Sequence, residues 1–511
     1  AMSLVFVPYV AVPAYWVLGR SRFEGYVNAR KLTEDVGEEL LVDLQGRIAP
    51  YRLDQQEIDP AILAAQGLAD QPMLTSNEVE LLVDGQETFD SILAGIDAAR
   101  EYVLFQFFIV KDDQIGNLVK DRLIAKANEG VSVYFLYDEM GSLGLPDSYL
   151  DELRAAGIEV SAFNTQKGPG NRFQINFRNH RKVVVVDGRV TWVGGHNVGD
   201  EYLGRDPAFG HWRDTHIRIE GPAAMGTQLS FLVDWYWATD QIINLPFLPS
   251  AAAGADTDVL ILPTGPADDL ESATLMFTHA INTARQRIWI ASPYFVPDLG
   301  LLNALQLAGL RGVDVRIMIP DMADHYLVYL AAFSYLEDAG RTGVRFFRYT
   351  EGFLHQKVML IDDSVATIGT ANMDNRSFRL NFEITAAIAG NAEFIDEVEA
   401  MFMNDFEHSR EVPSDELASK PWLVPVPCST GPTDVTNSVT VLSNRLRNAS
   451  PGSCGCCQQA TSAAIYAMIP GELRGNAEPL QFEKRSAMPI MREYIPCLEY
   501  WVQSCWFSCR W

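Results

Sequence analysis

His180-Arg-Lys182-Val-Val-Val-Val-Asp187 recurs 175 residues later as His355-Gln-Lys357-Val-Met-Leu-Ile-Asp362. In an extended segment, residues two apart point to the same face, so each copy presents an imidazole and an ammonium to one spot. Two such copies predict a symmetrical site that handles a phosphate group. The alternative is a pair of ordinary buried strands with polar ends, but core packing requires neither the histidine nor the lysine.

The residues after each motif repeat as well. Asp187-Gly188 and Asp362-Asp363 each lie between two apolar runs rich in β-branched residues, which predicts a hairpin in both copies. Each hairpin is followed by small residues and an asparagine, Asn197 or Asn372, 17 residues after the motif histidine. Small residues let the backbone approach a ligand, and an asparagine amide can donate to a phosphate oxygen. We therefore expect both asparagines to bind substrate.

These motifs resemble the phospholipase D superfamily and, within it, the bacterial cardiolipin synthases. The paired motifs alone are shared with nucleases and kinase-like members of the superfamily. The narrower resemblance rests on four further stretches, at residues 194–202, 212–222, 292–298 and 372–383. It covers roughly residues 75–412.

The resemblance implies a role for each motif residue. His180 would be the nucleophile that forms a phosphohistidine, and His355 would protonate the leaving alcohol and then deprotonate the incoming one. The lysines and asparagines would hold the phosphoryl oxygens. Asp187 and Asp362 end their strands on the opposite parity, which favours a structural role for them over phosphate contact. The candidate catalytic residues are His180, Lys182, Asp187, His355, Lys357 and Asp362.

Supporting residues are expected around the two histidines. A neutral nucleophilic imidazole needs its other nitrogen held as a donor, and the resemblance implies an acid from the opposite half, pairing Glu383 with His180 and Asp214 with His355. Two imidazoles near one phosphate should titrate as a coupled pair that shares one proton, so both would not be neutral in the resting site. Two arginines near the motifs are expected to bind the anionic substrate, although ion pairing in an acidic protein is an alternative; they are Arg178 and Arg376.

Internal repetition divides the chain near residue 250. Residues 95–110 match 280–296, and residues 130–136 match 312–318. Each half reads strand, helix, strand, helix, strand and then the motif hairpin, which indicates α/β layers around a buried sheet. With the resemblance, the expected fold is two similar phospholipase D-like α/β/α sandwich halves with mixed sheets, related by a pseudo-two-fold axis. Half 1 is residues 75–250, half 2 is residues 251–412, and residues 245–258 form the expected linker.

The halves differ before the motif. The first has 11 more residues between Asn164 and Asn179 than the second has at the equivalent place. This basic and aromatic stretch suits a lipid headgroup surface, and it equally suits an edge strand with one apolar face. Its basic residues Arg172 and Arg178, with Arg181 just after it, are interleaved with the apolar residues Phe173, Ile175 and Phe177.

Net charge and chemistry limit the partners. The charge of −26 argues against nucleic acid. Phosphodiester exchange needs a nucleophile, a proton donor and positive charge, which the paired motifs supply without a metal or another cofactor. The lysines also disfavour a divalent cation, since like charges repel. We expect phosphatidylglycerol and other membrane phospholipids as substrates, contact with a membrane surface, no nucleic-acid partner and no cofactor.

Both ends of the chain have unusual composition. Residues 1–19 carry no charge but contain two prolines, and Arg20, Arg22, Arg30 and Lys31 follow. Residues 1–22 resemble the end of a membrane hairpin, with residues 23–74 as a juxtamembrane linker, although an amphipathic or core segment is an alternative. The basic cluster places the halves on the cytoplasmic side of a bacterial inner membrane. Residues 413–511 hold all seven cysteines, lack the histidines and spacing of a zinc site, and are expected to be poorly structured.

The resulting functional hypothesis is a cardiolipin synthase. It would transfer a phosphatidyl group from one phosphatidylglycerol to another and release glycerol. A phospholipase D-type phosphodiesterase that hydrolyses phospholipid or nucleic acid is the alternative, because the paired motifs are common to both. A catalytically inactive membrane scaffold is disfavoured by intact motifs in both halves.

Overall fold

The computed structural model describes residues 23, 25–27, 44–53, 59–165, 176–322 and 326–413, which all belong to one compact unit. Three expectations fall outside these residues: the membrane-associated segment 1–22, residues 166–175 of the basic loop, and all but the first residue of the tail.

Half 1 is built around a mixed sheet with the strand order β4-β3-β2-β6-β7-β9-β1. Strands β2, β3 and β4 are parallel, and the others pair antiparallel. The strands are β1 (Leu74–Val83), β2 (Tyr102–Phe107), β3 (Ser132–Asp138), β4 (Glu159–Phe163), β6 (Val183–Val186), β7 (Val190–Gly194) and β9 (Thr215–Glu220). The helices are α6 (Asp84–Ala98), α7 (Gln114–Asn128), α8 (Asp147–Ala155) and α9 (Ala224–Thr239).

Half 2 repeats this order as β14-β13-β11-β16-β17-β19-β10, with β20 added at its edge. The strands are β10 (Thr257–Thr264), β11 (Arg287–Ala291), β13 (Asp314–Pro320), β14 (Arg345–Tyr349), β16 (Val358–Ile361), β17 (Val365–Gly369), β19 (Asn381–Ala389) and β20 (Ser409–Val412). The helices are α10 (Ser272–Thr283), α11 (Leu299–Leu310), α12 (Tyr326–Gly340), α13 (Asn375–Arg379) and α14 (Ala392–Glu407). The expected fold class is confirmed.

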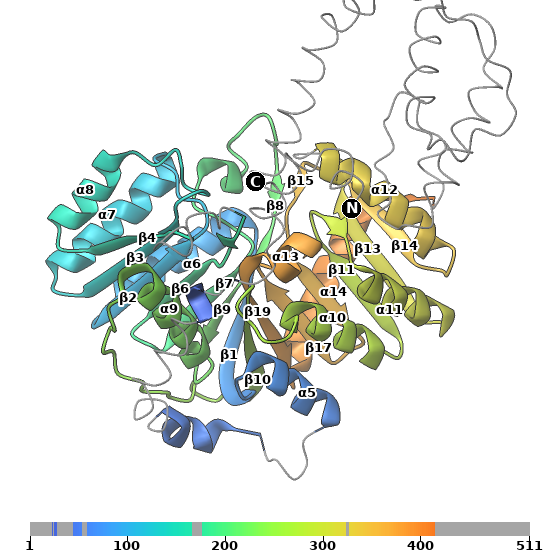
Figure 1. Cartoon of the computed structure of the whole chain (residues 1–511), viewed down its shortest axis with the longest axis horizontal. Helices are drawn as coiled ribbons and strands as arrows, with labels where there is room; N and C mark the ends of the chain where they lie inside the picture. The colour runs from blue at the N-terminus through green and yellow to red at the C-terminus, as the bar shows by residue number, and fades with distance from the viewer. Residues whose placement is uncertain are drawn as a thin grey trace, which may run out of the picture. The chain divides into compact units, whose positions relative to one another are not determined.

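The two sheets join through β1, which pairs with β9 and also with β10 (Figure 1). Residues 241–256, between α9 and β10, contain neither helix nor strand, so the expected linker is present except that β10 takes up its last two residues. The motif strands β6 and β16 are buried along their whole length, as their uninterrupted apolar sequences predict for strands covered on both faces. One hydrophobic cluster runs through both halves and includes Val185, Ile217, Leu360 and Ile384.

Short elements join the halves or complete the connections. Strand β5 (Arg178–Asn179) pairs with β19, and β8 (Trp212–Arg213) pairs with β15 (Phe353–Leu354), so each pair crosses from one half to the other. The remaining elements are η1 (Ala49–Tyr51), α5 (Pro60–Ala69), η2 (Asp200–Leu203), β12 (Phe295–Val296) and β18 (Met373–Asp374). The two crossing pairs lie directly before the two motif histidines, and they therefore set the register of the site.

The aspartate that ends each motif lies in the turn of its hairpin. Asp187 and Asp362 adopt left-handed backbone conformations, with φ of 51° and 49°, which aspartate tolerates better than most residues. The Asp187 carboxylate accepts the backbone N–H groups of residues 100–102, and the Asp362 carboxylate accepts those of residues 285–287. Both carboxylates lie at the opposite end of the strand from the motif histidine. These contacts support the structural role that strand parity favours for both aspartates, and a catalytic role for them stays a prediction.

Replacing Asp362 should destabilise the protein without removing its chemistry. In Asp362→Ala, alanine meets the left-handed conformation and three backbone amides lose their acceptor, so we expect the free energy of unfolding to fall by about 2–4 kcal/mol. The matched control is Asp363→Ala, which removes an exposed carboxylate paired with Arg287 and should change stability by less than about 1 kcal/mol. Urea denaturation followed by circular dichroism measures both. Equal losses in the two variants would contradict the assignment.

Candidate active site

Each motif histidine is held by a carboxylate from the other half. Nδ1 of His180 lies 2.8 Å from Oε2 of Glu383, and Nδ1 of His355 lies 2.6 Å from Oδ2 of Asp214. All four side chains are buried. These are the two pairings expected from the sequence and the resemblance. Because Nδ1–H donates to a carboxylate in each pair, Nε2 of each ring is left to act on a substrate.

The backbone sets the same crossed arrangement. The N–H of His180 donates to the carbonyl of Phe382, and the N–H of His355 donates to the carbonyl of Arg213, at 2.9 and 2.8 Å. Phe382 and Arg213 are the residues immediately before the two acids. Each histidine is thus tied to the opposite half through both its backbone and its ring.

The residue between histidine and lysine points away from the site and is anchored to a helix. Nη1 of Arg181 donates to Asp234 of α9 at 2.8 Å, and Nε2 of Gln356 donates to Asp405 of α14 at 2.8 Å. Asp234 also accepts hydrogen bonds from Gln106, Asn179 and the Tyr26 hydroxyl. The alternation of an extended chain therefore separates two tasks, catalysis on one face and anchoring on the other.

Both motif lysines are buried beside their histidines. Nζ of Lys182 donates to the carbonyl of His180 at 2.7 Å, and Nζ of Lys357 donates to the carbonyl of His355. Burial lowers the pKa of Lys182 to about 7, although Glu383 opposes the shift. A buried ammonium without an anion nearby is costly, so an entering phosphodiester would stabilise its charged form.

Burial disfavours the protonated form of both motif histidines. Burial lowers the pKa of His180 to about 4, against the opposing charge of Glu383. Burial also lowers the pKa of His355 well below its ordinary value, and the ammonium of Lys357, 2.9 Å from Nδ1, adds to the effect. This differs from the expectation of one shared proton in the resting site. The reason is that desolvation and the two lysines lower the pKa of both histidines, and for His180 they outweigh the opposing charge of Glu383.

The two asparagines occupy equivalent positions but have different partners. Oδ1 of Asn197 accepts the N–H of Ile109 at 3.1 Å, and its Nδ2 donates to the Tyr202 hydroxyl at 3.2 Å. Oδ1 of Asn372 is buried and, within the part of the chain that the structure describes, has no hydrogen-bond partner. Asn197 is therefore held on both sides of its amide, whereas Asn372 has an unused acceptor.

Of the two predicted substrate-binding arginines, Arg178 lies in the segment before the first motif, and Arg376 of α13 contacts that segment. Nη1 of Arg178 donates to the carbonyl of Phe177 at 2.6 Å, and the side chain is buried. Arg376 donates from both terminal nitrogens to Asn176, at 3.2 and 3.0 Å. Arg376 therefore joins half 2 to the chain that leads into His180. Its contact with substrate, and that of Arg178, remain predictions.

Aromatic rings surround both histidines, a feature that the sequence reasoning missed. Phe108 meets the His180 ring edge-to-face, with ring centroids 5.0 Å apart. Trp212 and Phe353 lie 5.1 and 6.0 Å from the His355 ring. These rings exclude water from around the imidazoles, which explains the strong desolvation. Only the fold brings them together, because they come from three separate parts of the chain.

A second feature missed from the sequence is a buried histidine pair in half 1. Nδ1 of His196 lies 3.1 Å from Nδ1 of His216, and both rings are fully buried. Burial lowers the pKa of His196 to about 4, against the opposing charge of Asp214. Half 2 has Ala371 and Thr385 at the equivalent positions. Comparing the two copies position by position would have found this difference.

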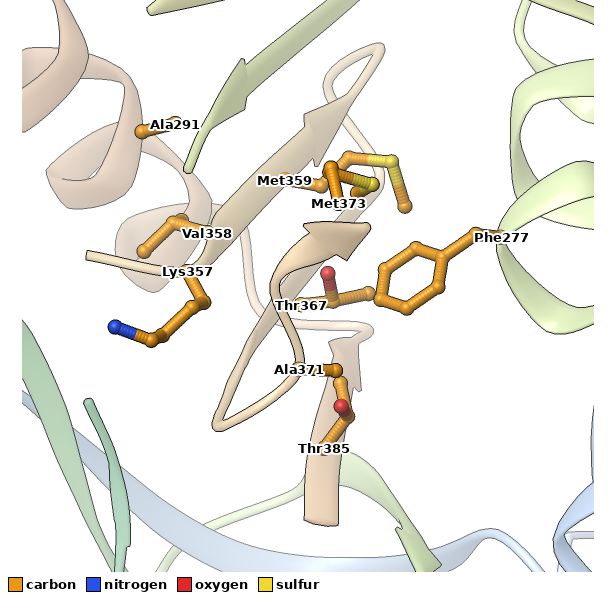
Figure 2. A pocket seen from close by; sticks show the side chains of 9 residues that line it. All are labelled: Phe277, Ala291, Lys357, Val358, Met359, Thr367, Ala371, Met373 and Thr385. Atoms are coloured by element: carbon orange, nitrogen blue, oxygen red, sulfur yellow. The ribbon is translucent and has the colours of Figure 1, made fainter. Parts of the chain in front are cut away.

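The smaller residues of half 2 leave a small pocket beneath the second motif. It has a volume of about 10 Å³ and is lined by residues that include Lys357, Ala371 and Thr385. Figure 2 shows Phe277, Met359 and Met373 turned toward one another, while the Lys357 ammonium points away from them. Such a volume holds about one water molecule, so this pocket cannot hold a lipid headgroup.

Two features are absent from the described residues. No helix among them is long and apolar enough to cross a bilayer. In the same parts of the chain, no group of three or more His, Cys, Asp or Glu side chains is arranged to hold a metal ion.

Comparison with known proteins identifies the family. The family profile described as "Cardiolipin synthase, PLD-like domain" matches residues 92–211 and 277–406, once in each half. Cardiolipin synthase A of Pseudomonas putida (strain GB-1) is 48% identical over 421 residues, which cover 81% of this chain and 87% of that protein. The same-named protein of Pseudomonas fluorescens (strain SBW25) is 46% identical over the same length. The chain belongs to the cardiolipin synthase family.

Family membership makes the chain a phosphatidyltransferase with phospholipid substrates. A solved structure supports the fold. The phosphatidylserine synthase of Haemophilus influenzae Rd KW20 matches with a TM-score of 0.56 at 15% identity, covering 76% of this chain and 99% of that chain. At this identity the likeness concerns the fold alone.

The lowered pKa values predict the pH dependence of kcat/KM, which reports the free enzyme. His180 should contribute a rise in kcat/KM through about pH 4, as it loses its proton and becomes nucleophilic, and Lys182 should contribute a fall above about pH 7, as it loses its charge. Lys182→Arg keeps the charge, so its alkaline limb should move to higher pH. Lys120→Arg, at a lysine of α7 paired with Glu152, is the control and should keep the original profile. An unchanged alkaline limb in Lys182→Arg would exclude Lys182 as its source.

Proposed function

We propose that the chain transfers the phosphatidyl group of one phosphatidylglycerol to the free hydroxyl of another and releases glycerol, through a phosphohistidine on His180. The supporting observation is the pair of crossed histidine–carboxylate contacts, which present two imidazole Nε2 atoms in one buried, cation-lined site. Two such groups suit a reaction that needs one nucleophile and one proton carrier.

In the first half-reaction, Nε2 of His180 attacks phosphorus and the bond from phosphorus to the glycerol oxygen breaks. Glu383 stabilises the positive charge that develops on the His180 ring, since its carboxylate accepts Nδ1–H. His355 donates a proton from Nε2 to the departing glycerol oxygen, and Asp214 holds its other nitrogen. The substrate anion raises the pKa of His355 when it binds, because it offsets the effect of the two lysines.

In the second half-reaction, the hydroxyl of another phosphatidylglycerol loses its proton to Nε2 of His355 and attacks phosphorus. The bond from phosphorus to Nε2 of His180 breaks, which restores the neutral imidazole. Lys182 and Lys357 neutralise the phosphoryl oxygens in both steps, and the amide of Asn372 contributes a further polar contact. Water in the same place would give hydrolysis, so the rings of Phe108, Trp212 and Phe353 favour transfer by limiting access.

The proposed location is the inner membrane of a bacterial cell, with both halves on the cytoplasmic side. It is supported by the uncharged stretch at residues 1–19 and by the arginines and lysine that follow it. The lipid substrates of the family also require access to a membrane surface.

Incubation with phosphatidylglycerol in micelles, with a chelator present, tests the proposed reaction. We expect cardiolipin and glycerol in equal amounts, because one glycerol leaves for each cardiolipin formed, and we expect chelator to have no effect. Phosphatidic acid as the main product would favour hydrolysis. Faster cleavage of plasmid or single-stranded DNA would favour a nuclease, and activity restored by a divalent ion would contradict the metal-free site.

The roles of the two histidines are tested by trapping the covalent intermediate. His355→Ala should still form phosphohistidine with a substrate whose leaving alcohol is acidic, because such a group departs without a general acid. His180→Ala should form none with any substrate. Mass spectrometry of acid-labile phosphopeptides measures both variants. Phosphate found on His355 in the His180→Ala protein would reverse the assignment.

A further inference from the structure

The helix layers of the two halves differ in charge. Neither α10 nor α11 contains an aspartate, glutamate, lysine or arginine, whereas their counterparts α6 and α7 contain four charged residues each. Helix α5, which packs against α10, is uncharged as well. In a chain with a net charge of −26, uncharged surface helices are unexpected unless their outer face is buried against another surface.

Equivalent positions on α7 and α11 show where the difference lies. Both helices have an aspartate N-cap, Asp113 and Asp298, whose side chain accepts the third N–H of the helix. From this alignment, Gln114, Arg122 and Ala125 of α7 correspond to three leucines of α11. Those leucines are Leu299, Leu307 and Leu310, whose exposed fractions are 73%, 52% and 71%.

Two of the exposed leucines, Leu270 and Leu299, lie at the N-terminal ends of α10 and α11, next to the helix α13 that follows the second motif hairpin. Arg379, the last residue of α13, donates to Glu271 and to Asp298, at the N-terminal ends of α10 and α11. Leu270, which precedes Glu271, is 59% exposed. Helix α13 directly follows β18 and therefore lies close in sequence to Asn372 (Figure 1). The ion pairs hold Leu270 and Leu299 near each other at this end.

We propose that this leucine face, made of Leu270, Leu299, Leu307 and Leu310, is the surface on which the protein rests on a phospholipid bilayer. The inference rests on the proposed function, in which two diacyl lipids must bring their headgroups to the histidines while their chains stay in the bilayer. Exposed leucines gain free energy when they enter the interfacial region. Helices α10 and α11 contain no carboxylate, and Glu271 at their N-terminal end is paired with Arg379, so this face can also approach anionic lipid, which repels the rest of this acidic chain.

The residues of α7 that align with the α11 leucines suggest a variant that tests the docking surface. The triple variant Leu299→Gln, Leu307→Gln and Leu310→Ala places on α11 the kinds of side chain that α7 carries, with glutamine in place of Arg122 so that net charge is unchanged. These positions are exposed, so the helix should fold as before. The matched control is Leu118→Asn, because Leu118 is an exposed leucine of α7 at the position that Asn303 occupies in α11.

Sedimentation of the full chain with phosphatidylcholine vesicles measures docking without turnover. We expect the triple variant to bind about tenfold or more weakly than wild type and the control to bind as wild type does. Conversion of short-chain phosphatidylglycerol below its micelle concentration should stay within about twofold of wild type in the triple variant, since the site is intact.

Separate outcomes overturn the two proposals. Vesicle binding by the triple variant that equals the control would exclude the leucine face as the docking surface. Unchanged vesicle binding together with a wild-type dimer that becomes monomeric in the triple variant, measured by analytical ultracentrifugation, would assign the face to a second copy of the chain. Wild type that binds vesicles but makes no cardiolipin would instead refute the proposed function and leave the docking result standing.

Discussion

The site depends on two hydrogen bonds that cross between the halves, from His180 to Glu383 and from His355 to Asp214. Neither half contains both members of a pair, so neither half alone would hold its imidazole in the reactive tautomer. The backbone bonds from the same histidines to Phe382 and Arg213 reinforce the constraint. The continuous sheet through β1 and β10 and the shared hydrophobic cluster keep the halves in this register.

Burial gives the site its chemistry at a cost in stability. Imidazoles, ammonium groups and carboxylates are all removed from water in one place, which is unfavourable unless each is paired. The pairs offset this only in part, as the lowered pKa values of His180 and Lys182 show. An anionic phosphodiester bound beside the two lysines would offset the rest of the cost of burying their charge. Substrate binding and the positioning of charge are therefore one event.

The repeated architecture makes each departure from symmetry informative. His196 and His216 fill the space behind Asp214, whereas Ala371 and Thr385 leave a small pocket in half 2. Asn197 is held through both ends of its amide and Asn372 is not. The outer helices of half 1 are charged, and α10 and α11 are not. The two halves thus differ in the side chains packed behind the acid that holds the histidine, in the hydrogen bonds of the motif asparagine and in the charge of their outer helices.

The sequence by itself determined the duplicated α/β fold and the motif hairpins, because residue alternation and internal repetition can be read directly from the order of the residues. The two crossed pairings were expected only from the resemblance to the phospholipase D superfamily. The sequence also indicated that Asp187 and Asp362 are structural, from their parity along the strand. Only the tertiary structure decided the lowered pKa values of the motif histidines, the aromatic rings around them and the buried His196–His216 pair. These depend on which groups are removed from water together, and desolvation is set by residues distant in sequence that only packing brings into contact.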